Sequence, residues 1–200
     1  MRRVRALVKG GALCYNRGMD HKRMPAAGDE EGDGRAEAII RPVRLDDAEA
    51  LHHTCYPEHS LDDVRDYLGW CVRQAGRGWI VRLVAEADDR AVGNAQLTVW
   101  KQGGEIGSLV VAPGYRRRGL ARRLVTALME EADRRGLESL EIAASARQPE
   151  IVAFYEGLGF ERVEGMDEPQ RLDAGKKNGL FHPASPDLTV LRRKQRCGGR

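Results

Sequence analysis

The sequence predicts an α+β (mixed α/β) fold, in which a central mixed and mostly antiparallel sheet of about six to seven strands is flanked by about four helices. Two observations lead to this prediction. Apolar side chains alternate with a period of two in residues 79–85, 91–100 and 105–112, and tight turns separate these segments, which is typical of an antiparallel meander. The chain then takes a helical period in residues 120–135 and returns to a strand at 140–144, so we expect a β-α-β crossover with a parallel strand pair.

The segment before the meander contains one strand and two helices. Residues 38–44 predict a short strand, and Asp46 or Asp47 is placed to cap the helix that follows it. Ser60 is placed to cap a second helix, whose apolar residues recur at three- and four-residue steps. The pattern therefore places two helices between the first strand and the meander.

The segment after the crossover contains a short helix and two more strands. Pro149 occupies the first turn of a helix that covers residues 150–158. Residues 160–163 and 188–192 predict the last two strands, and residues 165–186 between them are irregular.

We expect one globular domain, residues 37–194, because 200 residues suffice for a single core. Residues 1–36 are expected to be a disordered extension, since residues 25–34 (PAAGDEEGDG) are small, acidic and rich in turn formers. Residues 195–200 form a basic tail.

The net charge of +3 is unevenly distributed along the chain. Residues 1–24 carry +6 and residues 192–200 carry +5, which leaves −8 for the residues between them. Arg-rich ends are usually solvated tails, so nucleic acid is not the expected partner, whereas an acidic body suits a cationic substrate.

Composition restricts the cellular compartment and the kinds of site that we expect. No apolar run approaches the roughly 18 residues that a membrane-spanning helix needs. The four cysteines are scattered without a C-x-x-C pair. We therefore expect a cytoplasmic protein with reduced thiols, without a disulfide framework or a metal site.

The stretch from Glu105 to Gly136 combines a strand, a turn and a long amphipathic helix. A helix N-terminus offers free N–H donors and a partial positive charge, which favour anions and above all phosphates. A glycine at this position leaves room for a ligand to approach the backbone. The sequence therefore predicts a phosphate-binding turn, made by Arg116-Arg117-Arg118-Gly119-Leu120-Ala121.

Three motifs in this part of the chain resemble those of the GCN5-related N-acetyltransferase (GNAT) superfamily. They are Leu109-x-Val111-x-Pro113, Arg116-x-x-Gly119-x-Ala121, and the segment FYEGLGF at residues 154–160. The second motif alone is short and recurs by chance, but its spacing to the other two makes the match specific. The resemblance covers about residues 38–193.

The resemblance implies acetyl-coenzyme A as the co-substrate. In this family, backbone amides of the phosphate-binding turn hold the pyrophosphate, and the preceding strand pairs with the pantetheine arm. The family often has a bulge in that strand, which separates it in a V-shaped splay from the next strand, here 105–112 from 139–145. Many relatives have an asparagine where Gln148 stands here. The implied cofactor-binding residues are Leu109, Val110, Val111, Arg116, Arg117, Arg118, Gly119, Leu120, Ala121, Arg122 and Gln148.

The resemblance also implies catalytic groups. Tyr155 aligns with the tyrosine that the family places near the sulfur, where a phenol can protonate the departing thiolate; the alternative is a core tyrosine beside Phe154. A backbone amide at Val110 or Val111 is a candidate donor to the developing oxyanion.

Glu105 is the leading candidate for the base that deprotonates the amine, because histone-acetyltransferase-like members have a glutamate at this offset from the turn. A strand with a period of two places Glu105 on the same face as Gly107, Leu109 and Val111. Alternatively, Glu105 is only a charged residue at a strand end. The base is then a water chain or one of the weaker candidates, Glu141 and Glu86.

The predicted function is acetyl transfer from acetyl-CoA to a primary amine of a small molecule or peptide, by direct attack in a ternary complex. The alternative is a catalytically weak CoA-binding module that acts by interaction. Residues 56–78 and 165–186 are expected to select the acceptor, and Asp62, Asp63 and Asp66 can attract a cationic amine. The sequence does not decide whether the protein forms a homodimer or which amine it acetylates.

Overall fold

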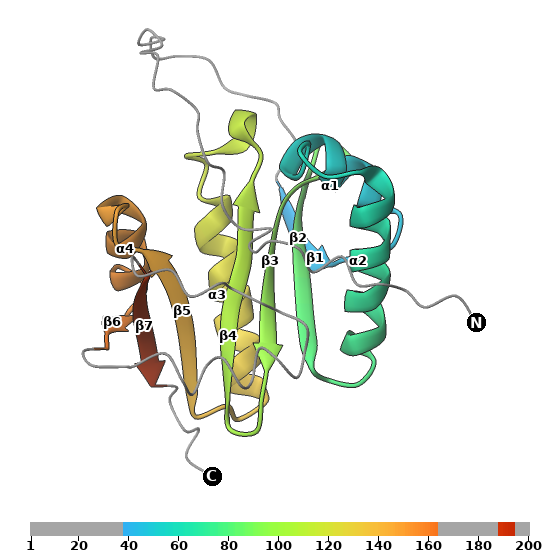
Figure 1. Cartoon of the computed structure of the whole chain (residues 1–200). Helices are drawn as coiled ribbons and strands as arrows, with labels where there is room; N and C mark the ends of the chain where they lie inside the picture. Colours follow the sequence, from blue (N-terminus) through green and yellow to red (C-terminus); the bar gives the residue numbers. More distant parts are fainter. Residues whose placement is uncertain (1–37, 164–187, 195–200) are drawn as a thin grey trace, which may run out of the picture.

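The computed structural model describes residues 38–163 and 188–194, which form one seven-stranded sheet with helices on both of its faces (Figure 1). The predictions made for residues 1–36, 165–186 and 195–200 lie outside the described residues.

The sheet has the strand order β1-β2-β3-β4-β5-β7-β6. Only β4 and β5 pair in parallel, and the other neighbouring strands of the described sheet are antiparallel. This confirms the antiparallel meander and the β-α-β crossover. The strands are β1 (Ile39–Pro42), β2 (Ile80–Ala87), β3 (Arg90–Val99), β4 (Gly103–Val111), β5 (Ser139–Ser145), β6 (Glu161–Arg162) and β7 (Leu188–Lys194).

Two helices cover each face of the sheet. Helices α1 (Asp47–Cys55) and α2 (Leu61–Ala75) pack on one face, while α3 (Leu120–Arg134) and α4 (Pro149–Glu156) contribute the larger core on the other. A short 3-10 helix, η1 (Pro113–Tyr115), joins β4 to the loop before α3. None of the helices in the described ranges is long and apolar enough to cross a bilayer.

The two N-terminal helices begin in different ways. Ser60 caps α2 as predicted, because its hydroxyl oxygen accepts a hydrogen bond from the Asp63 amide at 3.1 Å. At α1, Asp46 is the N-cap residue but its side chain makes no capping bond. The Asp47 carboxylate instead accepts the Arg44 amide at 2.7 Å and pairs with Arg41 of β1. The predicted side-chain cap is therefore replaced by an ion pair that ties α1 to the sheet.

Helix α3 supplies the main apolar surface of the crossover. Leu120, Leu124 and Leu128 are 4%, 0% and 0% exposed, which confirms the predicted core face. The helix starts after Gly119 and is followed by Gly136, and both glycines adopt left-handed backbone conformations. These two positions fix where the helix can meet the strands that precede and follow it.

The V-shaped splay is present between β4 and β5. The two strands are paired only from Gly103–Ser139 to Glu105–Glu141, and β4 then continues to Val111 without β5 beside it. On its other side, β4 has one extra residue opposite β3, and Ser108 at this bulge has a φ of 52°. The bulge bends β4 away from β5 and so opens the sheet at its centre.

Candidate active site

The loop before α3 presents backbone amides to solvent. Gly119, the N-cap, has a φ of 77°, and no side chain caps the helix. A Cβ added there would meet no protein atom within 4 Å, so the glycine is required by the left-handed backbone and the space in front of it is open. Arg117 also has a positive φ, of 65°. The first amides of α3 and the left-handed residues before them are thus arranged in a way that suits an anion.

The residues of the predicted turn contribute in different ways. The Arg116 Nε donates to the Val111 carbonyl oxygen at 3.0 Å, so this arginine braces the loop against the end of β4. The side chains of Arg117, Arg118 and Arg122 are exposed around the helix start. Leu120 is core, and only its main chain is available to a ligand. The site is therefore made by backbone amides with exposed arginines beside them.

Tyr115 connects this loop to the turn between β2 and β3. Its hydroxyl donates to Asp88 Oδ2 at 2.6 Å and accepts from Arg90 Nη2 at 3.0 Å. The Arg118 guanidinium carbon lies 5.1 Å from the centre of the Tyr115 ring. This tether joins residues more than 20 positions apart, and we find no local sequence signal that predicts it.

The bulge changes which residues of β4 share a face. Ile106 and Val111 both belong to the core under α3, and Leu109 packs against that core. Val110 packs against the core under α1 and α2. The prediction that Glu105 shares a face with Leu109 and Val111 is therefore wrong, because the extra residue at Ser108 shifts the alternation by one.

Glu105 lies on the α1/α2 face at the last residue pair that joins β4 to β5. Its register partners are Thr98 on β3 and Glu141 on β5, and partners in register point to the same face. Glu141 is 7% exposed and accepts two hydrogen bonds from Arg192 of β7, at 2.6 and 3.0 Å. Two carboxylates are thus register partners where the splay begins, and Arg192 compensates the second one.

Tyr155 lies on the other face of the sheet. Its side chain lies on α4 in the core under α3, is 7% exposed, and has edge contacts with Phe154 and Phe160 at ring distances of 5.0 and 6.1 Å. Its packing therefore matches the core-tyrosine alternative, and its position beside β5 is compatible with the predicted role as well.

Gln148 is the N-cap residue of α4, but its side chain does not cap the helix. Its side-chain oxygen Oε1 is buried and has no hydrogen-bond partner in the described structure. A buried acceptor without a donor is costly, so an N–H group from a ligand suits this position. Among the predicted cofactor-binding side chains, Gln148 gives the most direct sign of a missing partner.

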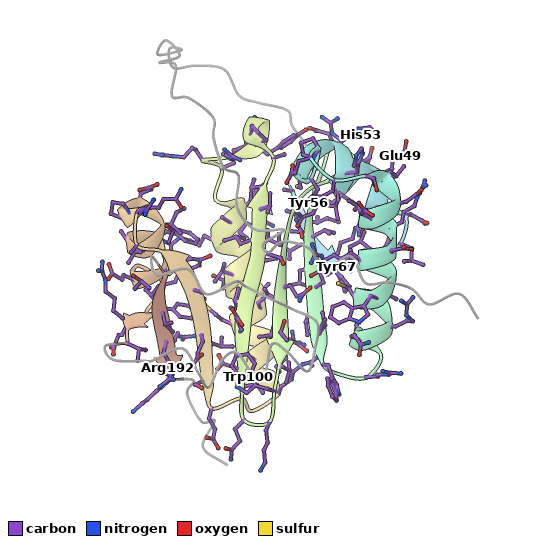
Figure 2. All side chains as sticks on the ribbon, in the orientation of Figure 1. Glu49, His53, Tyr56, Tyr67, Trp100 and Arg192 are labelled. Carbon is purple, nitrogen blue, oxygen red and sulfur yellow. The ribbon has the colours of Figure 1, made fainter. Side chains whose placement is uncertain are left out.

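A polar cluster that the sequence analysis missed lies between the sheet and α1–α2. Arg82 of β2 is 3% exposed and donates to Gln96 Oε1 at 3.0 Å, to the Tyr56 hydroxyl at 2.9 Å and to Asn94. Tyr67 of α2 also donates to Gln96, at 3.1 Å. Figure 2 shows Tyr56 and Tyr67 between these helices and the strands. Polar residues at every second position of β3, from 94 to 98, are the signal that could have indicated it.

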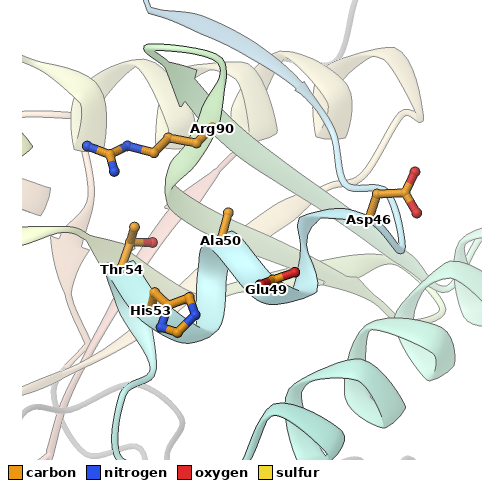
Figure 3. Close-up of a pocket in the computed structure, with 6 residues that line it drawn as sticks. All are labelled: Asp46, Glu49, Ala50, His53, Thr54 and Arg90. Atoms are coloured by element: carbon orange, nitrogen blue, oxygen red, sulfur yellow. The ribbon is translucent and has the colours of Figure 1, made fainter.

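A separate pocket of about 330 Å³ lies beside α1, lined by Asp46, Glu49, Ala50, His53, Thr54 and Arg90 (Figure 3). None of the predicted catalytic or cofactor-binding residues lines it. Among the described residues, no group of three His, Cys, Asp or Glu side chains is arranged to hold a metal ion.

Comparison with known proteins agrees with this geometry. The family model described as Acetyltransferase (GNAT) family matches residues 45–160, more than half of the chain. The [ribosomal protein bS18]-alanine N-acetyltransferase of Salmonella typhimurium is 34% identical over 83 residues, which are 42% of this chain and 56% of that protein. The chain thus spans little more than half the length of this curated relative.

Solved structures share the fold at low identity. The PaiA N-acetyltransferase of Thermoplasma acidophilum in complex with coenzyme A is 15% identical, has a TM-score of 0.56, and covers 80% of this chain and 99% of its own. The ribosomal-protein-alanine N-acetyltransferase of Brucella melitensis is 20% identical, has a TM-score of 0.60, and covers 78% of this chain and 99% of its own.

Proposed function

Because this chain belongs to the acetyltransferase (GNAT) family, we propose that it is an acetyl-CoA-dependent N-acetyltransferase that acts on a primary amine of a small molecule or peptide. The observation that carries the proposal is the opening between β4 and β5 beyond Glu105, with Glu105 on one face of the sheet and Tyr155, on the helix that packs against β5, in the core of the other face. An acyl donor in that opening is accessible to an amine from one face and to a proton donor from the other.

The residues around the opening fit acetyl-CoA. Amides at the start of α3 suit its pyrophosphate, the unpaired edge of β4 from 106 to 111 suits the amide groups of the pantetheine arm, and the buried Gln148 oxygen suits one of its N–H donors. When bound, the co-substrate supplies an acetyl group activated as a thioester.

Glu105 acts as the base. An amine with a pKa of about 10.4 is mostly ammonium at pH 7, and making it nucleophilic costs about 4.6 kcal/mol unless a base takes the proton in place. The carboxylate at the edge of the splay takes this proton first, which frees the lone pair with which the nitrogen then attacks the acetyl carbon. A backbone N–H at Val110 or Val111 stabilises the negative charge that develops on the carbonyl oxygen.

Tyr155 acts as the acid. As the carbon–sulfur bond breaks, its hydroxyl gives a proton to the sulfur, so that CoA leaves as a thiol with a pKa of about 8.5. The ammonium loses its first proton to Glu105, and the nitrogen loses a second one to solvent after it has bonded to the acetyl carbon. The departing sulfur gains a proton from Tyr155, so the products are an N-acetyl amide, CoA and one proton. Solvent then restores both side chains.

The acceptor amine and the cellular compartment are each supported by a few observations. The Salmonella relative is named for an alanine of ribosomal protein bS18, which supports a peptide α-amine as one acceptor to test. Asp62 and Asp66 are exposed on α2 and favour a cationic amine. Cys55 and Cys71 are free thiols, as expected in the reducing cytoplasm, where we place the reaction.

The experiment is a thiol-release assay with the full chain, acetyl-CoA and an amine panel of an alanine-initiated peptide, spermidine and kanamycin. CoA affinity is measured in parallel by calorimetry. We expect thiol release with at least one amine. Tight CoA binding without thiol release contradicts the enzyme and supports the alternative, a CoA-binding module that acts by interaction.

A further inference from the structure

Gly107 lies in the interior of β4, where a glycine weakens a strand because it has no side chain to pack. A glycine in such a place usually serves a positive φ, a bulge, or the close approach of another backbone or a ligand. The φ of Gly107 is not positive, and the residue pairs directly with Gln96 of β3, before the bulge at Ser108. Close approach of another group is therefore the remaining reason for a glycine here.

Other glycines of β3 and β4 have protein neighbours that account for them. A Cβ on Gly104 would lie 2.7 Å from Leu97 Cδ1, and one on Gly93 would lie 3.1 Å from the Val110 carbonyl oxygen. At Gly107, an added Cβ would meet no atom of the described residues within 4 Å. The described protein atoms around Gly107 thus do not account for the missing side chain.

Gly107 lies on the same face of the sheet as the proposed base. Its register partner Gln96 accepts a hydrogen bond from Tyr67 of α2 at 3.1 Å, so this is the face that α1 and α2 cover. Ile106, between Glu105 and Gly107, belongs to the core under α3 on the other face. Gly107 is therefore the next residue after Glu105 on the amine side, about 7 Å further along the strand.

Gly107 is also the first residue on this face beyond the paired part of β4 and β5. The pairing ends at Glu105 and Glu141, and β4 then continues while the two strands diverge (Figure 1). The space over Gly107 is thus bordered by Gln96 on the β3 side and by the opening on the β5 side. A group seated there lies beside the base and beside the thioester that the opening suits.

Gln96 is a fixed wall of this space. Its side-chain oxygen accepts hydrogen bonds from Arg82 at 3.0 Å, from Tyr67 at 3.1 Å and from the Cys71 thiol at 3.4 Å, and its NH₂ group donates to Thr98 at 3.1 Å. Gln96 is also only 3% exposed. Because both ends of its amide are engaged, Gln96 cannot turn aside for a larger side chain on β4 without losing these bonds. The room over the strand is therefore set by the residue on β4.

We propose that Gly107 is a specificity-determining residue of the acceptor site. The acceptor lies over its backbone, and the missing side chain leaves room for the carbon atoms next to the amine nitrogen. The inference rests on the proposed function and places the acceptor between Gln96 and the opening. A side chain added at Gly107 projects toward α1 and α2, so it obstructs the amine and leaves the CoA contacts of the β4 main chain intact.

The test compares full-length wild type with Gly107→Ala and Gly107→Val, using acetyl-CoA and the fastest acceptor among the alanine-initiated peptide, spermidine and kanamycin. Each added methyl group occupies acceptor space, so kcat/KM for the amine is expected to fall about 10-fold to 200-fold with alanine and further with valine, mainly through KM. CoA affinity stays within about twofold. The denaturant midpoint of unfolding does not fall, because alanine and valine both suit a strand better than glycine does.

Two control variants make the test specific. Gly114→Ala adds a Cβ that also meets no described atom within 4 Å, but it lies in η1 outside the sheet, so wild-type behaviour is expected in every measurement. Gly104→Ala places a Cβ 2.7 Å from Leu97 Cδ1, so a lower unfolding midpoint is expected. The second control shows how the protein responds where its own atoms fill the space over β4.

The possible failures are distinguishable. Wild type that acetylates none of the three amines overturns the proposed function and this inference with it. Active wild type with unchanged kcat/KM in both Gly107 variants overturns the inference alone. A loss of CoA affinity as large as the loss in kcat/KM also overturns it, because the space then belongs to the acyl donor. A lower unfolding midpoint in Gly107→Ala overturns it as well, because the protein itself then fills the space.

Discussion

Glu105 and Tyr155 lie on opposite faces of the sheet, Glu105 at the last residue pair between β4 and β5 and Tyr155 on helix α4, which packs against β5. Glu105 shares its face with α1 and α2, whereas Tyr155 lies in the core under α3. The separation follows from the register of Glu105 with Thr98 and Glu141 on one face and from the packing of α4 on the other. A base and an acid so placed can act on the two partners of one transfer without competing for the same proton.

Replacing Glu105 with glutamine is expected to lower kcat/KM about 100-fold to 10,000-fold, the usual contribution of a general base. The amide keeps the size of the side chain but cannot take a proton. Steady-state kinetics with saturating acetyl-CoA measures the change, and CoA affinity is expected to stay constant. Glu130→Gln, on the exposed surface of α3, is the matched control. A loss confined to CoA binding contradicts the role of Glu105.

Replacing Tyr155 with phenylalanine separates its two proposed roles. The ring contacts with Phe154 and Phe160 are retained, so the unfolding free energy is expected to fall by less than about 1.5 kcal/mol. Loss of the proton donor is expected to lower kcat about 10-fold to 100-fold or more. Denaturant unfolding and kcat are measured on the same preparation. Unchanged kcat leaves Tyr155 as a core residue only.

Gly119→Ala tests the anion site through its backbone. A left-handed conformation costs an L-residue about 1–2 kcal/mol, so the loop is expected to relax and CoA to bind about 5-fold to 30-fold more weakly. Gly114→Ala is the control, because a Cβ meets nothing within 4 Å there either and no left-handed φ is required. Calorimetric titration with CoA measures both. Equal affinity in the two variants contradicts the assignment of the site.

Much of this architecture follows from sequence periodicity, because long runs of period two or 3.6 reflect burial on one face. The leucines of α3 are such a case, whereas β3 is buried on both faces and its alternation separates apolar from polar buried side chains. Local patterns fail where a contact from a distant segment decides the outcome. Asp47 pairs with Arg41 of β1 and is not a cap, and Arg82 donates to Tyr67 of α2 and to Tyr56, the residue after α1. Glu105 shares a face with Gly107 as predicted, but not with Leu109 and Val111, because Ser108, a non-glycine residue, adopts a positive φ that the sequence does not indicate.

Tyr115→Phe is expected to weaken CoA binding about 3-fold to 10-fold, with kcat at saturating acetyl-CoA unchanged. The variant keeps the ring beside Arg118 but loses the hydroxyl that joins the loop to Asp88 and Arg90, so the anion site loses its outer support. CoA titration and kcat together test this. A fall in kcat at unchanged affinity contradicts a role confined to the loop.

Cys55 and Cys71 are expected to resist thiol reagents in the folded protein. Burial raises the pKa of both thiols, so they stay protonated at pH 8, and the reactive thiolate increases only as pH rises further. Because both pKa values are higher in the folded state, the protonated thiols stabilise the fold at neutral pH. This contribution is lost as pH rises above about 8.5. A variant with Cys14→Ser and Cys197→Ser is titrated with a disulfide reagent, with and without denaturant. Rapid labelling of the folded variant at pH 8 contradicts the expectation.

The most direct test of acetyl transfer across the β4–β5 opening is a mass-spectrometric balance of one reaction, in which CoA thiol and acetylated amine are counted together. Direct attack in a ternary complex predicts one N-acetylated amine for each CoA released, and no acetyl group on the protein when acetyl-CoA is supplied without amine. Release of CoA without acetylated amine, or an acetylated protein that then transfers its acetyl group, would contradict it.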